Sequence, residues 1–144
     1  MKSLFNRLFA PPLGGFATDA AMLVLRLWLG LTMLLNHGLG KLTNFGDMSA
    51  KFLDLFGIGS TASLALAVFA EAFCSALLVI GLVTRFAALN LVATMLVAFT
   101  MAHQMKLTGE RNGELAFIYL AGYVTLLIAG PGRYSADACL FRKG

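Results

Sequence analysis

The chain has 144 residues, of which 59% are hydrophobic and only 12% are charged, and its net charge is +4. A soluble domain carries about 25% charged residues, so this composition excludes an ordinary soluble protein and favours a single domain, residues 1–144, within a bilayer. The Lys and Arg residues are scattered and form no basic stripe with interleaved aromatic residues. Lipid is therefore the expected environment, and nucleic acid is excluded as a partner.

The first ten residues do not resemble the apolar core of a signal peptide. Lys2 and Arg7 interrupt the apolar side chains of this stretch, and Pro11-Pro12 follows it. The pattern favours a short amphipathic turn at the membrane surface over residues 1–10.

Four later segments have nearly the length of a bilayer-spanning helix, which is about 20 residues. They cover residues 18–36, 61–83, 86–103 and 113–130. Strands are not expected, because isolated strands in lipid cannot satisfy their backbone hydrogen bonds. The sequence predicts an all-α integral membrane four-helix bundle with a tight turn at Thr84-Arg85.

The orientation of the bundle follows from the Lys and Arg residues that flank the predicted spans. Four spans place both termini on one side, with six basic residues against four on the other. The six are Lys2, Arg7, Arg85, Arg133, Arg142 and Lys143; the four are Lys41, Lys51, Lys106 and Arg111. Because positive residues favour the cytoplasmic side, both termini are predicted to be cytoplasmic.

Two residues of opposite charge lie inside the apolar spans, Arg26 in the first and Glu71 in the second. An ionised side chain in hydrocarbon is costly, so such residues usually pair or serve a function. At about 1.5 Å per residue, both lie at similar depths from the cytoplasmic side. An Arg26–Glu71 ion pair is therefore predicted. The alternative is that Arg26 extends to the interface while Glu71 stays protonated.

Helical spacing extends this site along the helices. Arg26, Gly30, Met33 and His37 share one face of the first span. A stripe of small and polar residues, Ser63, Ala67, Glu71 and Ser75, follows the second, as is typical of packed membrane helices.

A polar group lies at the predicted outer ends of the helices. It comprises His37, Lys41, His103 and Glu114. Each alone is read as a solvated interfacial residue, but a four-helix bundle would bring them together as a vestibule for a substrate or quinone.

Metal and thiol chemistry have little support in the sequence. Cys74 and Cys139 lie at opposite depths and form no Cys-x-x-Cys motif, so no disulfide is expected. His37, His103 and Glu114 lack the close histidine spacing of common zinc motifs, and no bound metal is expected. A haem held between the two histidines is the less favoured alternative.

The end of the fourth span carries a helix-stop motif, Gly130-Pro131-Gly132. Glycine favours a helix C-cap and proline cannot continue the helical hydrogen bonds. Arg133 is expected to contact the lipid headgroups and the negative end of that helix. Arg85, in the tight turn between the second and third spans, is expected to contact lipid phosphate.

Six motifs in chain order resemble the DoxX family of bacterial membrane proteins. They are Leu25-Arg26-Leu27, residues 37–42 (HGLGKL), Glu71, residues 81–85 (GLVTR), residues 112–116 (NGELA) and residues 130–135 (GPGRYS). The resemblance runs from about Ala20 to Ala138. It implies a four-helix protein of the bacterial inner membrane that serves as an oxidoreductase subunit. One relative belongs to a quinone-reducing thiosulfate oxidoreductase, and others are linked to complexes that handle thiol and oxidative stress.

Two classes of function fit these residues. In the first, the protein is a quinone-linked or partner-dependent oxidoreductase subunit, with His37, Glu71 and Arg26 as catalytic residues. Quinone reduction consumes protons, which a buried titratable group can exchange. Because no flavin, haem or iron–sulfur motif occurs, electrons would come from a soluble redox partner. The residues identify no cofactor, and quinone is the candidate.

The second class is a non-enzymatic membrane scaffold or small permeation unit. In that class the Arg26–Glu71 pair only locks the helices together. Homo-oligomerisation is compatible with either class.

Overall fold

The computed structural model describes residues 15–141, and over this range the protein is helical without a strand. The amphipathic turn predicted for residues 1–10 lies outside the described residues. Three helices are long and apolar enough to cross a membrane, Phe16–Thr43, Ser60–Ile80 and Thr84–Ala102. A fourth apolar helix, Glu114–Ala129, is shorter. The predicted all-helical membrane architecture is thereby confirmed in its main elements.

The first long helix continues further than the sequence predicted. It consists of α2 (Phe16–Met33), a π-helical segment η1 (Leu34–Gly38) and α3 (Leu39–Thr43), and the short helix α4 (Phe45–Ser49) comes next. Gly38 has helical dihedral angles, φ −66° and ψ −52°. The predicted end of the first span at residue 36 is therefore too early, because Gly38 serves helix packing and does not reverse the chain.

The second and third long helices each contain a π-helical segment as well. The second consists of α5 (Ser60–Val68), η2 (Phe69–Cys74) and α6 (Ser75–Ile80). The third consists of α7 (Thr84–Val97) and η3 (Ala98–Ala102).

The turn between these two helices lies slightly earlier than predicted. Gly81 ends α6 with φ +76°, and Val83 precedes α7 with φ +43°. Thr84 and Arg85, the predicted turn residues, instead begin α7. The left-handed conformation of Gly81 explains this position, because glycine adopts it without a steric penalty.

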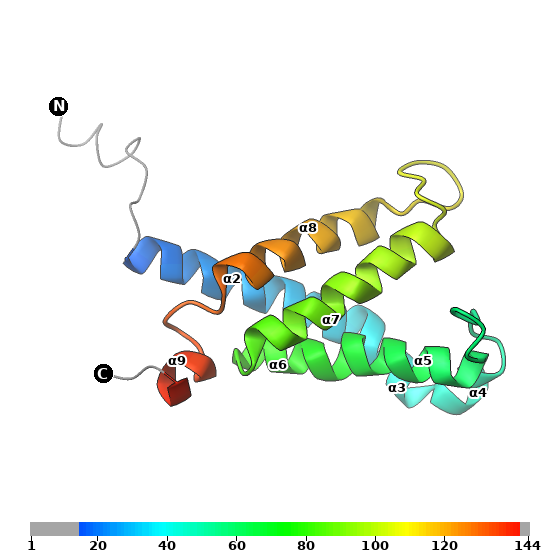
Figure 1. Ribbon diagram of the computed structural model, residues 1–144, viewed down its shortest axis with the longest axis horizontal. Coiled ribbons are helices and arrows are strands. Elements are labelled where there is room, and N and C mark those ends of the chain that lie inside the picture. Colours follow the sequence, from blue (N-terminus) through cyan, green and yellow to red (C-terminus); the bar gives the residue numbers. More distant parts are fainter. Residues whose placement is uncertain (1–14, 142–144) are drawn as a thin grey trace.

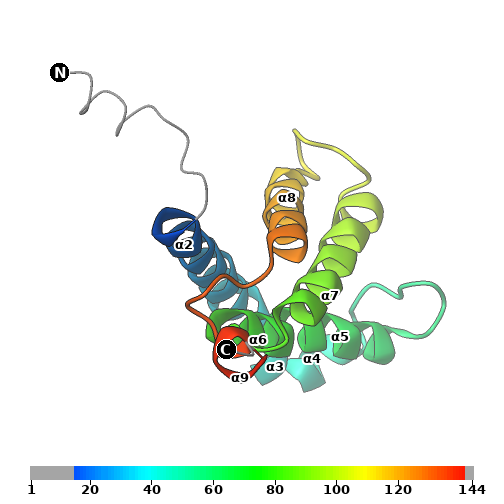
Figure 2. The ribbon, with the colours of Figure 1, turned by 60° about the vertical axis from the view of Figure 1, so that its left-hand side comes forward.

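The helices α7 and α8 (Glu114–Ala129) pack closely side by side, and α2 packs against α6 and α8 (Figures 1 and 2). A short last helix, α9 (Ala136–Phe141), was not expected from the sequence. The start of α2 and helix α9 lie at one end of the bundle, called here the terminal end (Figure 1). Helix α4 and the α7–α8 loop lie at the opposite end, called the loop end.

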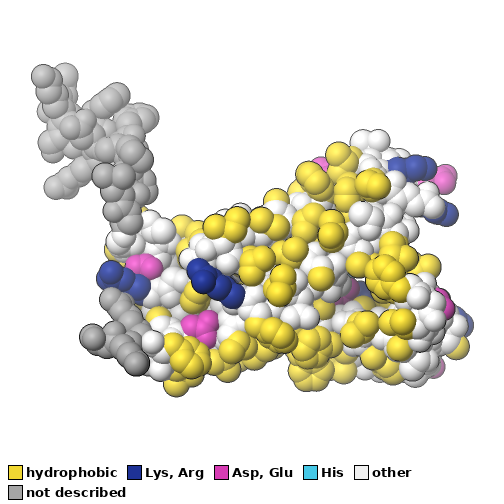
Figure 3. Space-filling view, in the orientation of Figure 1, with side chains coloured by type: hydrophobic (Ala, Val, Ile, Leu, Met, Phe, Trp, Pro, Cys, Tyr) yellow, Lys and Arg dark blue, Asp and Glu magenta, His cyan; other side chains and the backbone are white. Residues whose placement is uncertain are grey.

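The core is formed by side chains from α2, α6, α7 and α8. Its fully buried members include Leu78, Leu91, Tyr123 and Leu126. Large apolar side chains are also exposed along the outer faces of the helices, for example Trp28 on α2 (Figure 3 shows one such face). An apolar exterior of this extent is unusual for a soluble monomer and suits contact with lipid.

Candidate functional site

The buried carboxylate Glu71 forms an ion pair with Lys41. Glu71 lies in η2 and is 7% exposed, and Lys41 lies in α3, one turn after η1. An opposite charge within contact distance offsets the cost of holding each ion in a low-dielectric environment. Lys41 therefore provides the opposite charge that Glu71 needs inside a membrane span.

Gly38 makes this pairing possible by allowing the first two helices to approach closely. A Cβ atom at Gly38 would lie 2.6 Å from the carbonyl carbon of Glu71 and 2.7 Å from the backbone nitrogen of Ala72. No larger residue fits such a distance without moving a backbone. Lys41 follows Gly38 by three residues, so it lies on the same helix face and reaches Glu71.

The predicted Arg26–Glu71 ion pair is wrong. Arg26 is 1% exposed, and its guanidinium donates hydrogen bonds to two backbone carbonyls. The Nη1 group reaches the Pro131 oxygen at 2.8 Å, and Nη2 reaches the Tyr134 oxygen at 2.6 Å. These carbonyls lie in the segment after α8, at the terminal end. Glu71 is instead paired with Lys41, which follows Gly38 in the chain, whereas Arg26 precedes it. The two charges therefore have separate partners.

The bonds of Arg26 belong to a larger structure, which we call the C-terminal clasp and define as residues 131–141. Asp137 of the clasp accepts hydrogen bonds from the backbone nitrogens of Val83, at 2.6 Å, and Thr84, at 2.9 Å. Its own backbone nitrogen donates to the Gly81 carbonyl at 2.9 Å. A carboxylate at the start of α7 satisfies free N–H groups and complements the helix dipole.

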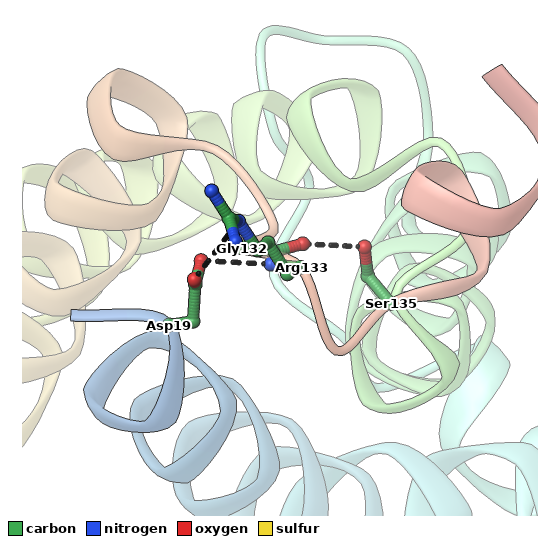
Figure 4. A network of polar contacts seen from close by, with 4 residues as sticks. All are labelled: Asp19, Gly132, Arg133 and Ser135. Atoms are coloured by element: carbon green, nitrogen blue, oxygen red, sulfur yellow. Dashed lines mark hydrogen bonds and ion pairs between the residues drawn. The ribbon is translucent and has the colours of Figure 1, made fainter. Parts of the chain in front are cut away.

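A second set of contacts fixes the clasp to the start of α2 (Figure 4). Asp19 accepts a hydrogen bond from the Arg133 backbone nitrogen at 2.9 Å and lies 3.3 Å from the Arg133 Nε atom. Within the clasp itself, the Ser135 hydroxyl donates to the Gly132 carbonyl at 2.8 Å. The expectation that Arg133 meets the end of α8 is therefore corrected, since Asp19 holds it.

The predicted helix stop is confirmed. Helix α8 ends at Ala129, and both Gly130 and Gly132 have positive φ angles, 81° and 72°. Arg85 donates a long hydrogen bond, 3.4 Å, to the carbonyl of Ile128 in the last turn of α8. Arg85 thus occupies the position at the negative helix end that the sequence assigned to Arg133.

A cavity of about 420 Å³ lies beside the Lys41–Glu71 pair, between α5–η2 and α7, and it is called here the groove. The space-filling view shows the molecule hollowed between these elements, toward the loop end (Figure 3). Four of its lining residues are polar: Lys41, Glu71, Asn90 and Thr94. The others are Phe52, Leu53, Leu55, Phe56, Leu66, Ala67, Phe69, Ala70, Ala93, Val97, Ala98 and Ala102.

Of the four residues predicted to form the vestibule, Lys41 lines the groove. His37 packs edge-on against Tyr119, with ring centroids 6.2 Å apart, and Tyr119 in turn stacks on Tyr123 at 5.8 Å. Glu114 is exposed at the start of α8. The groove lining includes Lys41 but not His37, His103 or Glu114, so a vestibule shared by all four residues stays a prediction.

His103 lies beside Gly113, at the beginning of α8. A Cβ atom at Gly113 would lie 2.7 Å from the Cβ of His103. Within residues 15–141, no three His, Cys, Asp or Glu side chains are grouped closely enough to hold a metal ion.

Asn90 and Thr94 are site residues that sequence reasoning missed. Both lie on α7 and line the groove, one helical turn apart. The signal was present, because an Asn amide inside the apolar run of residues 86–103 is uncommon in a membrane helix and usually faces protein or a cavity. Asp137 was missed because no pattern in the residues after Gly132 predicted ordered structure there.

The DoxX family profile matches residues 21–104, more than half of the chain. The matched region contains Gly38, the Lys41–Glu71 pair and both polar residues of α7. Helix α8 and the clasp lie beyond it. Neither the curated proteins nor the solved structures yield a match to this chain.

Proposed function

The chain belongs to the DoxX family of membrane proteins, and on that premise we propose that it binds a quinone in the groove as the membrane subunit of an oxidoreductase. One observation carries this proposal: an ion pair, Lys41–Glu71, stands at the wall of an otherwise largely apolar cavity inside membrane-length helices. Small-molecule sites typically combine an apolar lining with a few polar groups, in volumes of about 300–1,000 Å³. The groove fits this description.

The charged pair suits the head group of such a ligand. The Lys41 ammonium has three N–H donors, of which one is used by Glu71, so it can donate to a quinone carbonyl oxygen. Reduction of a quinone to its quinol takes up two electrons and two protons. Glu71 and Lys41 would exchange these protons, and a soluble redox partner would supply the electrons.

The catalytic roles predicted from the sequence change accordingly. Arg26 becomes a structural residue, because both terminal nitrogens of its guanidinium are bonded to carbonyls of the clasp segment. His37 immediately precedes Gly38 and stays a candidate proton carrier between the Lys41–Glu71 pair and the loop end of the bundle. His103 and Glu114 stay candidates for that path.

We further propose four membrane crossings, with both termini in the cytoplasm of a bacterial inner membrane and residues 1–144 forming one domain. Helix α2 begins at the same end of the bundle at which α9 lies (Figure 1). This arrangement supports an even number of crossings. Helix α8 has 16 residues, a length of about 24 Å. This length is less than a hydrocarbon core of about 30 Å, so the residues that flank α8 would have to complete the crossing.

The decisive experiment is quinone retention by the protein purified in a mild detergent. Extraction and lipid mass spectrometry should find quinone with the wild-type protein, and less with Glu71→Gln or Lys41→Met. Glu110→Gln, in the exposed α7–α8 loop, is the matched control and should retain the wild-type amount. His37→Ala tests the proton path, and it should leave retention intact while slowing partner-dependent reduction.

The scaffold function is the second candidate, and the same observation supports it. An intramembrane Lys41–Glu71 pair also locks two helices together. A wild-type protein that retains no quinone and binds none when it is added would favour the scaffold.

A further inference from the structure

The wall of the groove opposite the ion pair carries its own polar residues, and we infer that Asn90 and Thr94 select ligands whose head group donates a hydroxyl hydrogen. This inference rests on the proposed function, and it names the reduced, quinol form as the preferred ligand. The hydrogen bonds that these two side chains already make within α7 determine which groups they can still offer to a ligand.

Thr94 uses its hydroxyl hydrogen for a bond within α7. Its Oγ1 atom donates to the Asn90 carbonyl at 2.9 Å, and a threonine hydroxyl carries a single hydrogen. The lone pairs of Oγ1 are the groups that it can still offer. Thr94 therefore lines the groove as a hydrogen-bond acceptor.

Asn90 presents a second acceptor on the same wall. Its Nδ2 group donates to the Phe86 carbonyl at 2.9 Å, which leaves one amide hydrogen and the Oδ1 oxygen. Within residues 15–141, no hydrogen bond to Oδ1 occurs. Asn90 is partly buried and lines the groove, so this oxygen is available to a ligand.

The two polar walls lie at the same level of the bundle. Helices α6 and α7 join through the turn at Gly81–Val83, and η2 packs against α7. Glu71 lies nine residues before the end of α6 at Ile80, and Thr94 lies ten residues after the start of α7 at Thr84. The groove thus offers N–H donors from Lys41 on one wall. On the other it offers the Thr94 acceptor and the Asn90 amide, which can both accept and donate.

This arrangement distinguishes the two redox forms of a quinone. Both oxygens of the oxidised form are acceptors: they can accept from Lys41 and from the second amide hydrogen of Asn90, but they leave the Thr94 Oγ1 acceptor without a donor. The quinol carries hydroxyl groups, so it can donate to α7 while its other oxygen accepts from Lys41. A site built around a ligand hydroxyl discriminates strongly against an analogue that lacks it, because its own polar groups then stay unpaired.

Redox-inert probes test this preference without electron transfer. The probes are 4-heptylphenol and its methyl ether, 4-heptylanisole, which differ in the hydroxyl hydrogen. Equilibrium dialysis of the full chain in detergent should show the phenol bound about tenfold more tightly, the ratio expected for one hydrogen bond to a buried acceptor. Thr94→Val should reduce this ratio to near one, and Asn90→Leu should lower it, whereas Thr94→Ser should preserve it.

Thr100→Val is the matched control, because Thr100 makes the same type of bond, to the Leu96 carbonyl at 2.7 Å, but does not line the groove. It should bind both probes as the wild type does. Equal wild-type affinities, or a preference that survives in a folded Thr94→Val protein, would overturn the inference while leaving the groove a ligand site. Binding of neither probe by the wild type would also overturn the inference, and quinone retention then decides whether the proposed function stands.

Discussion

Gly38 lies directly against the peptide unit that joins Glu71 and Ala72, at a point where both helices contain a π-helical segment. Segments of this kind widen a helix locally and are often found at functional sites. Here the contact fixes the distance between the first two long helices. It also brings Lys41 into contact with the side chain of Glu71, and both residues line the groove.

The first prediction concerns this contact. Gly38→Ala adds a Cβ that would overlap the backbone of Glu71, so it should lower the free energy of unfolding by about 1–3 kcal/mol, as overpacking typically does. Unfolding in mixed detergent and SDS micelles measures the change. Gly40→Ala is the control, because a Cβ there would meet no atom within 4 Å, and it should be neutral or stabilising. Equal stability of both variants would contradict the role of Gly38.

The second prediction concerns the partner of Glu71. In a double-mutant cycle of Lys41→Met with Glu71→Gln, the coupling free energy should be about 1–3 kcal/mol, since the two side chains are in contact. The corresponding cycle of Arg26→Met with Glu71→Gln should be nearly additive, because Arg26 is bonded elsewhere. Strong coupling in the Arg26 cycle together with none in the Lys41 cycle would restore the pairing predicted from the sequence.

The third prediction concerns the C-terminal clasp. Arg26→Met removes both donors to the Pro131 and Tyr134 carbonyls and should cost about 3 kcal/mol, the magnitude of hydrogen bonds to a charged group. Limited proteolysis should then cut residues 131–141 faster. Asp137→Ala should act in the same direction, by about 1 kcal/mol for a lost helix cap.

Arg133→Met is the control for the clasp, since its side chain is 63% exposed. Exposed ion pairs contribute at most about 1 kcal/mol, so this variant should be cut at nearly the wild-type rate. Unchanged proteolysis in Arg26→Met would show that the clasp is held by other contacts.

The fourth prediction concerns topology. Cysteines introduced at Ser49 and Thr108, both at the loop end, should react with a membrane-impermeant maleimide in intact cells. The natural Cys139 is exposed at the terminal end and Cys74 is buried, so Cys139 should react only after the membrane is permeabilised. Labelling of Cys139 in intact cells, without labelling at Thr108, would invert the proposed orientation.

The positions of the helices could be predicted from the sequence because they depend on local properties. Apolar runs of membrane length became the long helices, since lipid requires every backbone group to be bonded within its segment. Gly130 and Gly132 ended α8 as predicted, because their positive φ angles suit only glycine. The stripe of Ser63, Ala67 and Ser75 proved buried around Glu71, as periodicity alone indicated.

The pairing of the charges was decided by tertiary structure. Depth along straight helices favoured Arg26 as the partner of Glu71, but the first two helices pack with Gly30 against Val79 and Arg26 beside Gly81. Arg26 therefore lies near the end of α6, more than two helical turns from Glu71. The Gly38 contact then selects Lys41. The partners of Arg26 are backbone carbonyls more than 100 residues away in the chain, and no side-chain pattern marks them. Charge and hydropathy determined which residues needed partners, and the packing of the helices determined which partners they received.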